Sequence, residues 1–175
     1  MEYLIVVGIL LMIVAPIMAV LPTPSQRKKM ALRKAAMSLG INVEITSIDD
    51  PDPLQAKYLS SSGKQLPPIL KVVAYRVQYV RPMEWNSPPR RNWVIERRKD
   101  NEEGELPGAW CWGSEPPPEL SSKLLSFIIL NLESLPQDVI RVDECSRIIS
   151  VYWQELGDEQ GLQSIHYFLE NCGKL

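Results

Sequence analysis

Ile69-Leu-Lys-Val-Val-Ala-Tyr-Arg-Val-Gln-Tyr-Val80 is the stretch that decides the fold. It is rich in β-branched and aromatic residues, which favour strands. Read with a period of two, Val73, Tyr75 and Val77 share one face, while Arg76 lies on the wetter opposite face. The pattern predicts a long central strand in a sheet that is covered on one side.

Shorter segments on both sides of this strand have the same alternating or β-branched character. The turn-rich residues 100–108 separate two of them, which predicts a hairpin. A second hairpin is predicted over 139–156 because β-branched residues dominate there. A single helix over those residues is the alternative. The predicted strands are 41–45, 69–80, 93–97, 109–112, 139–142 and 148–153.

Two later segments have apolar residues at helical spacing, residues 118–134 and residues 160–171. Strands and helices that are segregated in this way indicate an α+β domain. We therefore predict a domain over residues 41–175 with a mostly antiparallel sheet of about five to six strands. The two helices are expected to pack on one face of that sheet.

The N-terminus differs from the rest, because residues 3–21 contain no charged side chain. At about 1.5 Å per residue, such a helix reaches roughly 28 Å, close to the thickness of a bilayer core. Glu2 is the only side-chain charge before this run, and no convincing small-residue cleavage site follows it, so a cleaved secretory signal is not favoured. Residues 1–21 are predicted to be a transmembrane anchor, with the span at 3–21.

A basic juxtamembrane helix is predicted at residues 22–40. Thr23, Pro24 and Gln26 resemble a capped helix start, and Gly40 is a natural stop. Because basic residues favour the cytoplasmic side, we expect a single-pass protein of the bacterial inner (plasma) membrane, with its N-terminus outside and its C-terminal domain in the cytoplasm. These bases are candidate lipid-headgroup contacts, with a solvated flank as the alternative. They are Arg27, Lys28, Lys29, Arg33 and Lys34.

The apolar span followed by Pro24-Ser25-Gln26-Arg27-Lys28, and then by Leu39-Gly40-Ile41-Asn42-Val43, resembles YajC, the accessory subunit of the bacterial preprotein translocase. The resemblance covers about the first 45 residues. More loosely, the layout is similar to uncharacterised single-pass inner-membrane proteins of proteobacteria. The resemblance implies a bacterial inner membrane and an accessory role.

No segment has the pattern of a catalytic, metal or cofactor site. The three cysteines are widely spaced, and His166 is the single histidine, so neither a disulfide framework nor a zinc site is indicated. The glycines form no phosphate-binding motif. The aspartates of residues 49–53 lack the spacing of a calcium loop and are expected to form an exposed turn. We predict no catalytic residue, no metal and no cofactor.

Tryptophan and arginine supply the candidate partner-binding residues. Trp110 and Trp112 are two apart, so on a strand both face the same way. They are predicted either to pack in the core or to form an apolar platform for a partner protein. The charged rim of such a platform would be Arg90, Arg91, Arg97 and Arg98. Nucleic acid is not favoured, because this basic segment is short and acids lie beside it.

These features predict a non-catalytic, membrane-anchored accessory or assembly protein. Its domain would dock a partner protein or complex in or near the same membrane. The alternative is a membrane-tethered enzyme or ligand-binding module of unfamiliar type. Its pocket would lie among the tryptophans and the loop at residues 49–52.

Overall fold

The structure of the protein is a computed structural model of residues 1–175. The residues that the structure describes are 3, 5–8, 10, 12–14, 21–79, 92–98, 105–115, 117 and 120–175. The chain divides into two compact units, Met1–Ala31 and Leu32–Leu175. The second unit contains the sheet and the helices that cover it.

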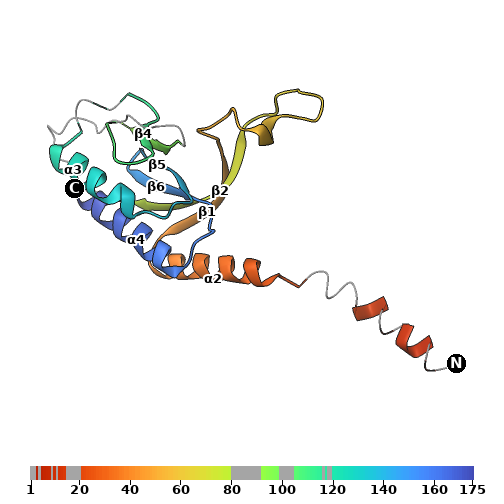
Figure 1. Ribbon diagram of the computed structural model, residues 1–175. Coiled ribbons are helices and arrows are strands. Elements are labelled where there is room, and N and C mark those ends of the chain that lie inside the picture. Colours follow the sequence, from red (N-terminus) through yellow and green to blue (C-terminus); the bar gives the residue numbers. More distant parts are fainter. Residues whose placement is uncertain are drawn as a thin grey trace. The chain divides into compact units, whose positions relative to one another are not determined.

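Six antiparallel strands form one sheet in the order β1-β2-β6-β5-β3-β4 (Figure 1). The α+β class, the antiparallel sheet and both hairpins are thus confirmed, and the region 139–156 is strands rather than one helix. The strands are β1 (Asn42–Asp49), β2 (Ile69–Gln78), β3 (Trp93–Arg97), β4 (Trp110–Trp112), β5 (Val139–Cys145) and β6 (Ile148–Trp153).

The alternation of β2 separates the two faces of the sheet. Val73 and Tyr75 are buried in the main core, whereas Val72 and Ala74 belong to a second, smaller apolar cluster. Because successive side chains of a strand point to opposite faces, the two clusters lie on opposite sides of the sheet. Tyr152 of β6 joins the smaller cluster.

Two helices, α3 (Ser122–Asn131) and α4 (Glu159–Lys174), pack side by side on one face of the sheet (Figure 1). The opposite face is called the open face below. The side chain of Ser121 caps α3 by accepting from the amide of Leu124 at 3.1 Å. Asp158 caps α4 by accepting from the amides of Gln160 and Gly161. These caps satisfy amides that a helix start leaves unpaired.

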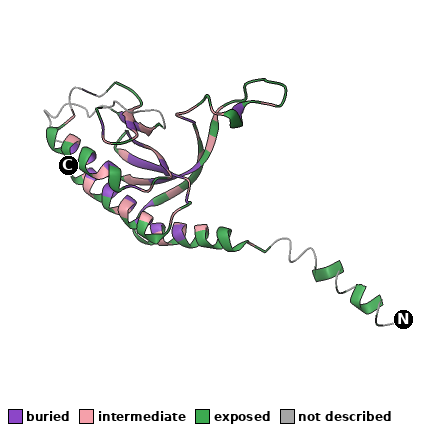
Figure 2. Ribbon diagram, viewed as in Figure 1, coloured by how far each residue is buried: buried purple, intermediate pink, exposed green. Residues whose placement is uncertain are grey.

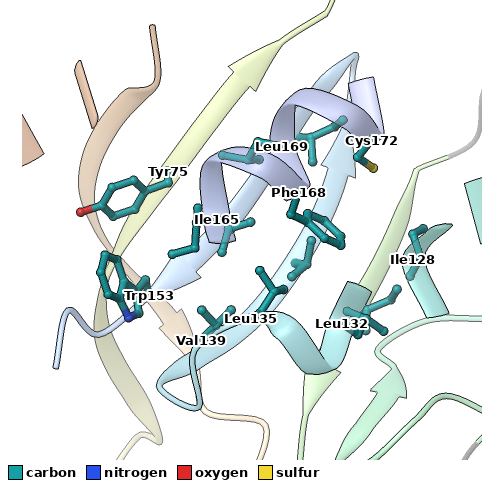
Figure 3. Close-up of a cluster of buried hydrophobic side chains, with 14 of the residues drawn as sticks. Tyr75, Ile128, Leu132, Leu135, Val139, Trp153, Ile165, Phe168, Leu169 and Cys172 are labelled. Carbon is teal, nitrogen blue, oxygen red and sulfur yellow. The ribbon is translucent and has the colours of Figure 1, made fainter. Parts of the chain in front are cut away.

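The main core lies between the sheet and these helices (Figure 3). Tyr75 and Trp153 form one end of it, with ring centroids 5.5 Å apart. Phe168 of α4 and Ile128 of α3 extend it towards the 3-10 helix η2 (Leu132–Ser134). The indole nitrogen of Trp153 is buried and has no hydrogen-bond partner among the described residues.

Helix α2 (Pro24–Ser38) begins as the sequence predicts. The Thr23 amide donates to the Gln26 side chain at 2.8 Å, and the Gln26 amide donates to the Thr23 hydroxyl at 3.3 Å. This reciprocal pair is a capping box. Gly40 ends the helical segment with φ of 79°, a conformation that glycine adopts readily.

The predicted transmembrane anchor at residues 1–21, with its span at 3–21, is wrong. None of the helices in the described part of the chain has both the length and the apolar character that crossing a bilayer requires. A crossing takes about 20 predominantly apolar residues. The longest of the helices given above, α2 and α4, have 15 and 16 residues, and both contain charged side chains. The predictions of a single-pass topology and of an inner-membrane location depended on this span, so they are not supported either.

Candidate functional site

A hollow of about 410 Å³ lies at one end of the sheet and is called the trough here. Its apolar lining comes from Leu70, Ala109, Ile140 and Leu156. Its polar lining joins the loop that follows β1 to the segments around β3, β5 and the end of β6. The polar residues are Asp50, Asp52, Gln55, Lys57, Arg97, Arg98, Gln137, Asp138 and Gln154.

Two of the apolar residues that line the trough, Leu70 and Ile140, lie on the open face. Leu70 and Ile140 pack against the smaller apolar cluster, which α3 and α4 do not cover. A register shift between Val139 and Arg141 interrupts the ladder of β5 beside Ile140. Such bulges re-aim side chains at the margins of a sheet. Leu156 is 71% exposed, so apolar surface of the trough reaches solvent.

Asp50 anchors one wall of the trough. It is 6% exposed, and its carboxylate accepts from the Tyr58 hydroxyl at 2.6 Å and from the Asp52 amide at 2.9 Å. Lys57 forms an ion pair with it at 2.8 Å. Burial alone would raise the pKa of Asp50, but the hydrogen bonds from Lys57 and Tyr58 outweigh burial and hold the pKa below its usual value. This wall is therefore anchored by an ionised, well-bonded carboxylate.

Arg97 and Arg98 line the trough from the end of β3. The Arg97 guanidinium lies 4.3 Å from the centroid of the Trp110 ring and donates to the Pro136 carbonyl at 3.0 Å. Burial lowers the pKa of Arg97, and the nearby charge of Asp138 opposes that change. Arg97 forms no ion pair within 4.0 Å in the part of the chain that the structure describes. Its neighbour Arg98 pairs with Glu96 at 3.5 Å.

Charges in the trough balance, with three acidic and three basic side chains among the residues that line it. Three glutamine amides add both hydrogen-bond donors and acceptors. A strongly anionic ligand would meet acids as well as bases there. An apolar lining with amides and balanced charges suits a neutral or mixed-charge ligand that carries its own amides.

The two candidate tryptophans do not form an exposed platform. Trp110 is 1% exposed and belongs to the main core, while Trp112 is partly buried and packs against it. The packing interpretation of Trp110 is therefore the one that the structure favours. Trp110 meets the trough through Arg97, which lies over its ring.

The candidate arginines fall into two groups. Arg97 and Arg98 both line the trough. Arg90 and Arg91 lie outside the described residues. Strand β3, which ends at Arg97, is an inner strand between β5 and β4.

Among the bases of α2, Arg33 has a defined structural role. Its guanidinium donates to both carboxylate oxygens of Glu155, at 2.8 and 2.5 Å, and the Tyr75 hydroxyl donates to the same carboxylate at 2.9 Å. Glu155 is 3% exposed. The hydrogen bond with Glu155 raises the pKa of Arg33, because it favours the charged guanidinium. The structure does not test the sequence-based prediction of lipid-headgroup contacts for the other bases, which are Arg27, Lys28, Lys29 and Lys34.

The other described side chains that could take part in chemistry do not line the trough. His166 is half-buried on α4, and no cluster of three metal-ligating side chains is found in the described residues. Glu144 is buried on the helix side, where Tyr79 and the Trp93 indole, at 2.7 Å, donate to it. None of the three cysteines forms a disulfide: Cys145 is exposed, Cys111 is partly buried and Cys172 is buried.

Sequence reasoning missed the polar contacts that build the trough. It placed Asp50 in an exposed turn, although the side chain is buried and bonded to Tyr58. Tyr58, an aromatic residue eight positions later in a polar loop, was the one sequence signal that could have predicted this contact. No sequence signal pairs Arg33 with Glu155, which are 122 residues apart. Asp138 and Gln137 also line the trough, and no sequence motif marks them as part of a site.

Comparisons with known proteins found no matching family model, no matching curated protein and no matching solved structure.

Proposed function

We propose that this chain is a non-catalytic docking protein that binds a polypeptide segment of a partner in the trough. The main support for this proposal is the lining of the trough, in which an apolar surface is surrounded by glutamine amides and by equal numbers of acidic and basic side chains. A polypeptide offers apolar side chains together with backbone donors and acceptors, so it matches such a lining.

Preorganisation of the walls supports this proposal. Asp50 is held by Lys57, Tyr58 and a backbone amide, and Arg97 is held by Trp110 and the Pro136 carbonyl. A partner that meets fixed polar groups loses less conformational entropy on binding than one that must order them. Arginine is also among the residue types that are enriched in binding hot spots.

The test is photo-crosslinking in cells that naturally contain the protein. p-Benzoylphenylalanine replaces Leu156, which lines the trough, and in the control replaces Leu130 of α3, which is 79% exposed. We expect defined adducts from position 156 that position 130 does not give. The charge reversal Arg98→Glu should abolish them, and the matched reversal Lys123→Glu on α3 should not. Identical adducts at both positions would contradict docking in the trough.

A second candidate, a small-ligand-binding module, is favoured by the volume of the trough. About 410 Å³ falls within the usual range for small-molecule sites. Thermal unfolding with a panel of amide-containing metabolites separates the two functions. A ligand that raises the unfolding midpoint of the wild type, but not that of Arg98→Glu, would favour the small-ligand module over polypeptide docking.

A further inference from the structure

β1 forms one edge of the sheet, and no strand among the described residues pairs with its outer side. All eight of its residues pair with β2 without a register shift. None of them is fully buried, and Ile45 at the middle of the strand is 69% exposed. The strand therefore presents a long, regular edge with an apolar side chain at its centre.

The outward-pointing amides follow from the pairing. The Asp50 amide donates to the Pro68 carbonyl at 2.7 Å, so the position just beyond β1 is a hydrogen-bonded pair. Hydrogen-bonded and non-bonded pairs alternate along an antiparallel ladder. The even-numbered residues of β1 therefore turn their amides towards β2. Val43, Ile45, Ser47 and Asp49 turn theirs outward, and none of these four amides bonds to another part of the described chain.

This edge carries few of the features that normally block strand addition. Proteins protect free edges with lysine, proline, bulges or a covering segment. β1 contains no lysine and no proline, and its ladder has no bulge. Two acids, Glu44 and Asp49, are its only charged residues, and Glu44 is paired with Arg76 of β2. The edge is suited to accept another strand.

We infer that the edge accepts β1 of a second copy of this chain, in an antiparallel pair centred on Ile45. Directly opposed residues in an antiparallel pair lie on the same face, which limits the registers available. Centring on Ile45 sets this side chain against itself, Val43 against Ser47 and Glu44 against Thr46. No acid then opposes an acid. A shift to a centre at Glu44 would set two carboxylates against each other, which is unfavourable.

Symmetry supports a second copy as the occupant. A two-fold axis through the strand makes each copy supply the same donors and acceptors, so the contact closes after two chains. Val43, Ile45 and Ser47 then bond in register across the axis, and the two exposed Ile45 side chains cover each other. The result is one continuous sheet through both copies. This inference is independent of the trough.

The test uses light scattering after size-exclusion chromatography of the full chain, with the Ser47→Pro and Ser47→Ala variants. Proline at residue 47 removes an outward amide and leaves the ladder to β2 intact, since proline is tolerated where the N–H faces away from the sheet. We expect the wild type and Ser47→Ala to have twice the 19.9 kDa mass of one chain. Ser47→Pro should have half the wild-type mass.

Two further variants keep the result interpretable. Ile45→Lys should also give the mass of a single chain, whereas Leu130→Lys on α3 should stay dimeric. Circular dichroism and the thermal midpoint show whether each variant is folded. A wild type with the mass of one chain, an assembly larger than two chains, or a dimer that survives both Ser47→Pro and Ile45→Lys overturns the inference.

Discussion

At the scale of single residues, the domain contains carboxylates that are buried and bonded rather than exposed. Glu155 is held by Arg33 and Tyr75, and Asp50 is held by Lys57 and Tyr58. A buried carboxylate that loses its partner keeps its desolvation cost and loses its compensation. These residues are therefore where single changes should affect stability most strongly.

Arg33→Ala should lower the free energy of unfolding by about 2 kcal/mol, less than the roughly 3–5 kcal/mol of a fully buried pair, because the Arg33 side chain is 25% exposed. Urea unfolding measures this change. The control Lys34→Ala, on the exposed side of α2, should have little effect. In Arg33→Ala with Glu155→Gln the combined loss should be smaller than the sum of the single losses. Additive losses would show that the pair does not act as a unit.

Asp50 should make stability depend on acid pH. Its pKa is held below its ordinary value in the folded state, so the stabilisation is present above the unfolded pKa of about 3.9 and is lost as the pH falls through the lower folded pKa. Urea unfolding from about pH 5 downwards should show this loss. The decline should be shallower in Asp50→Asn and unchanged in Asp49→Asn. Equal slopes in all three proteins would refute the role of Asp50.

At the scale of elements, local signals located the strands and the start of α2, and they failed where contacts between distant residues decide the structure. The helix predicted over residues 118–134 was too long, because α3 spans Ser122–Asn131. Alternation located β2 and both hairpins, and Thr23 with Gln26 marked the start of α2. Alternation states which residues share a face but not which face is covered, so the burial of Trp110 could not be decided. The apolar run at residues 3–21 predicted a span from composition, which does not specify how long a helix is.

The cap of α4 gives a prediction at this scale. Asp158→Ala removes the acceptor for the amides of Gln160 and Gly161 and should cost about 1 kcal/mol of folding free energy. Asp158→Asn retains a capping oxygen and should cost much less. The thermal midpoints of the two variants provide the comparison. Equal losses would mean that the charge of Asp158, rather than its capping bond, stabilises the helix.

At the scale of the whole molecule, one core joins the sheet to its helices. Trp93, Trp110 and Trp153 come from three different strands, are at most 1% exposed and belong to the same cluster. The burial pattern of the strands and of the inner sides of α3 and α4 follows this cluster (Figure 2). The trough joins segments distant in the chain, so no local pattern could have predicted it.

Because Trp93, Trp110 and Trp153 share one core, unfolding followed by tryptophan fluorescence should coincide with unfolding followed by far-ultraviolet circular dichroism. A single cooperative core loses its packing and its backbone structure together. Urea titrations with both probes on the same samples measure the two midpoints and slopes. Separate transitions would show that part of the sheet unfolds independently of the tryptophan cluster.

The unequal exposure of the three thiols has a practical consequence. Cys145 lies exposed at the end of β5, Cys172 is buried, and burial raises the pKa of Cys111, which disfavours its reactive thiolate form. A maleimide dye or nitroxide should therefore mark the folded wild-type protein at one place without mutagenesis. With a nitroxide on Cys145 of each chain, the distance between the two labels in a strand-paired dimer could be measured by electron paramagnetic resonance.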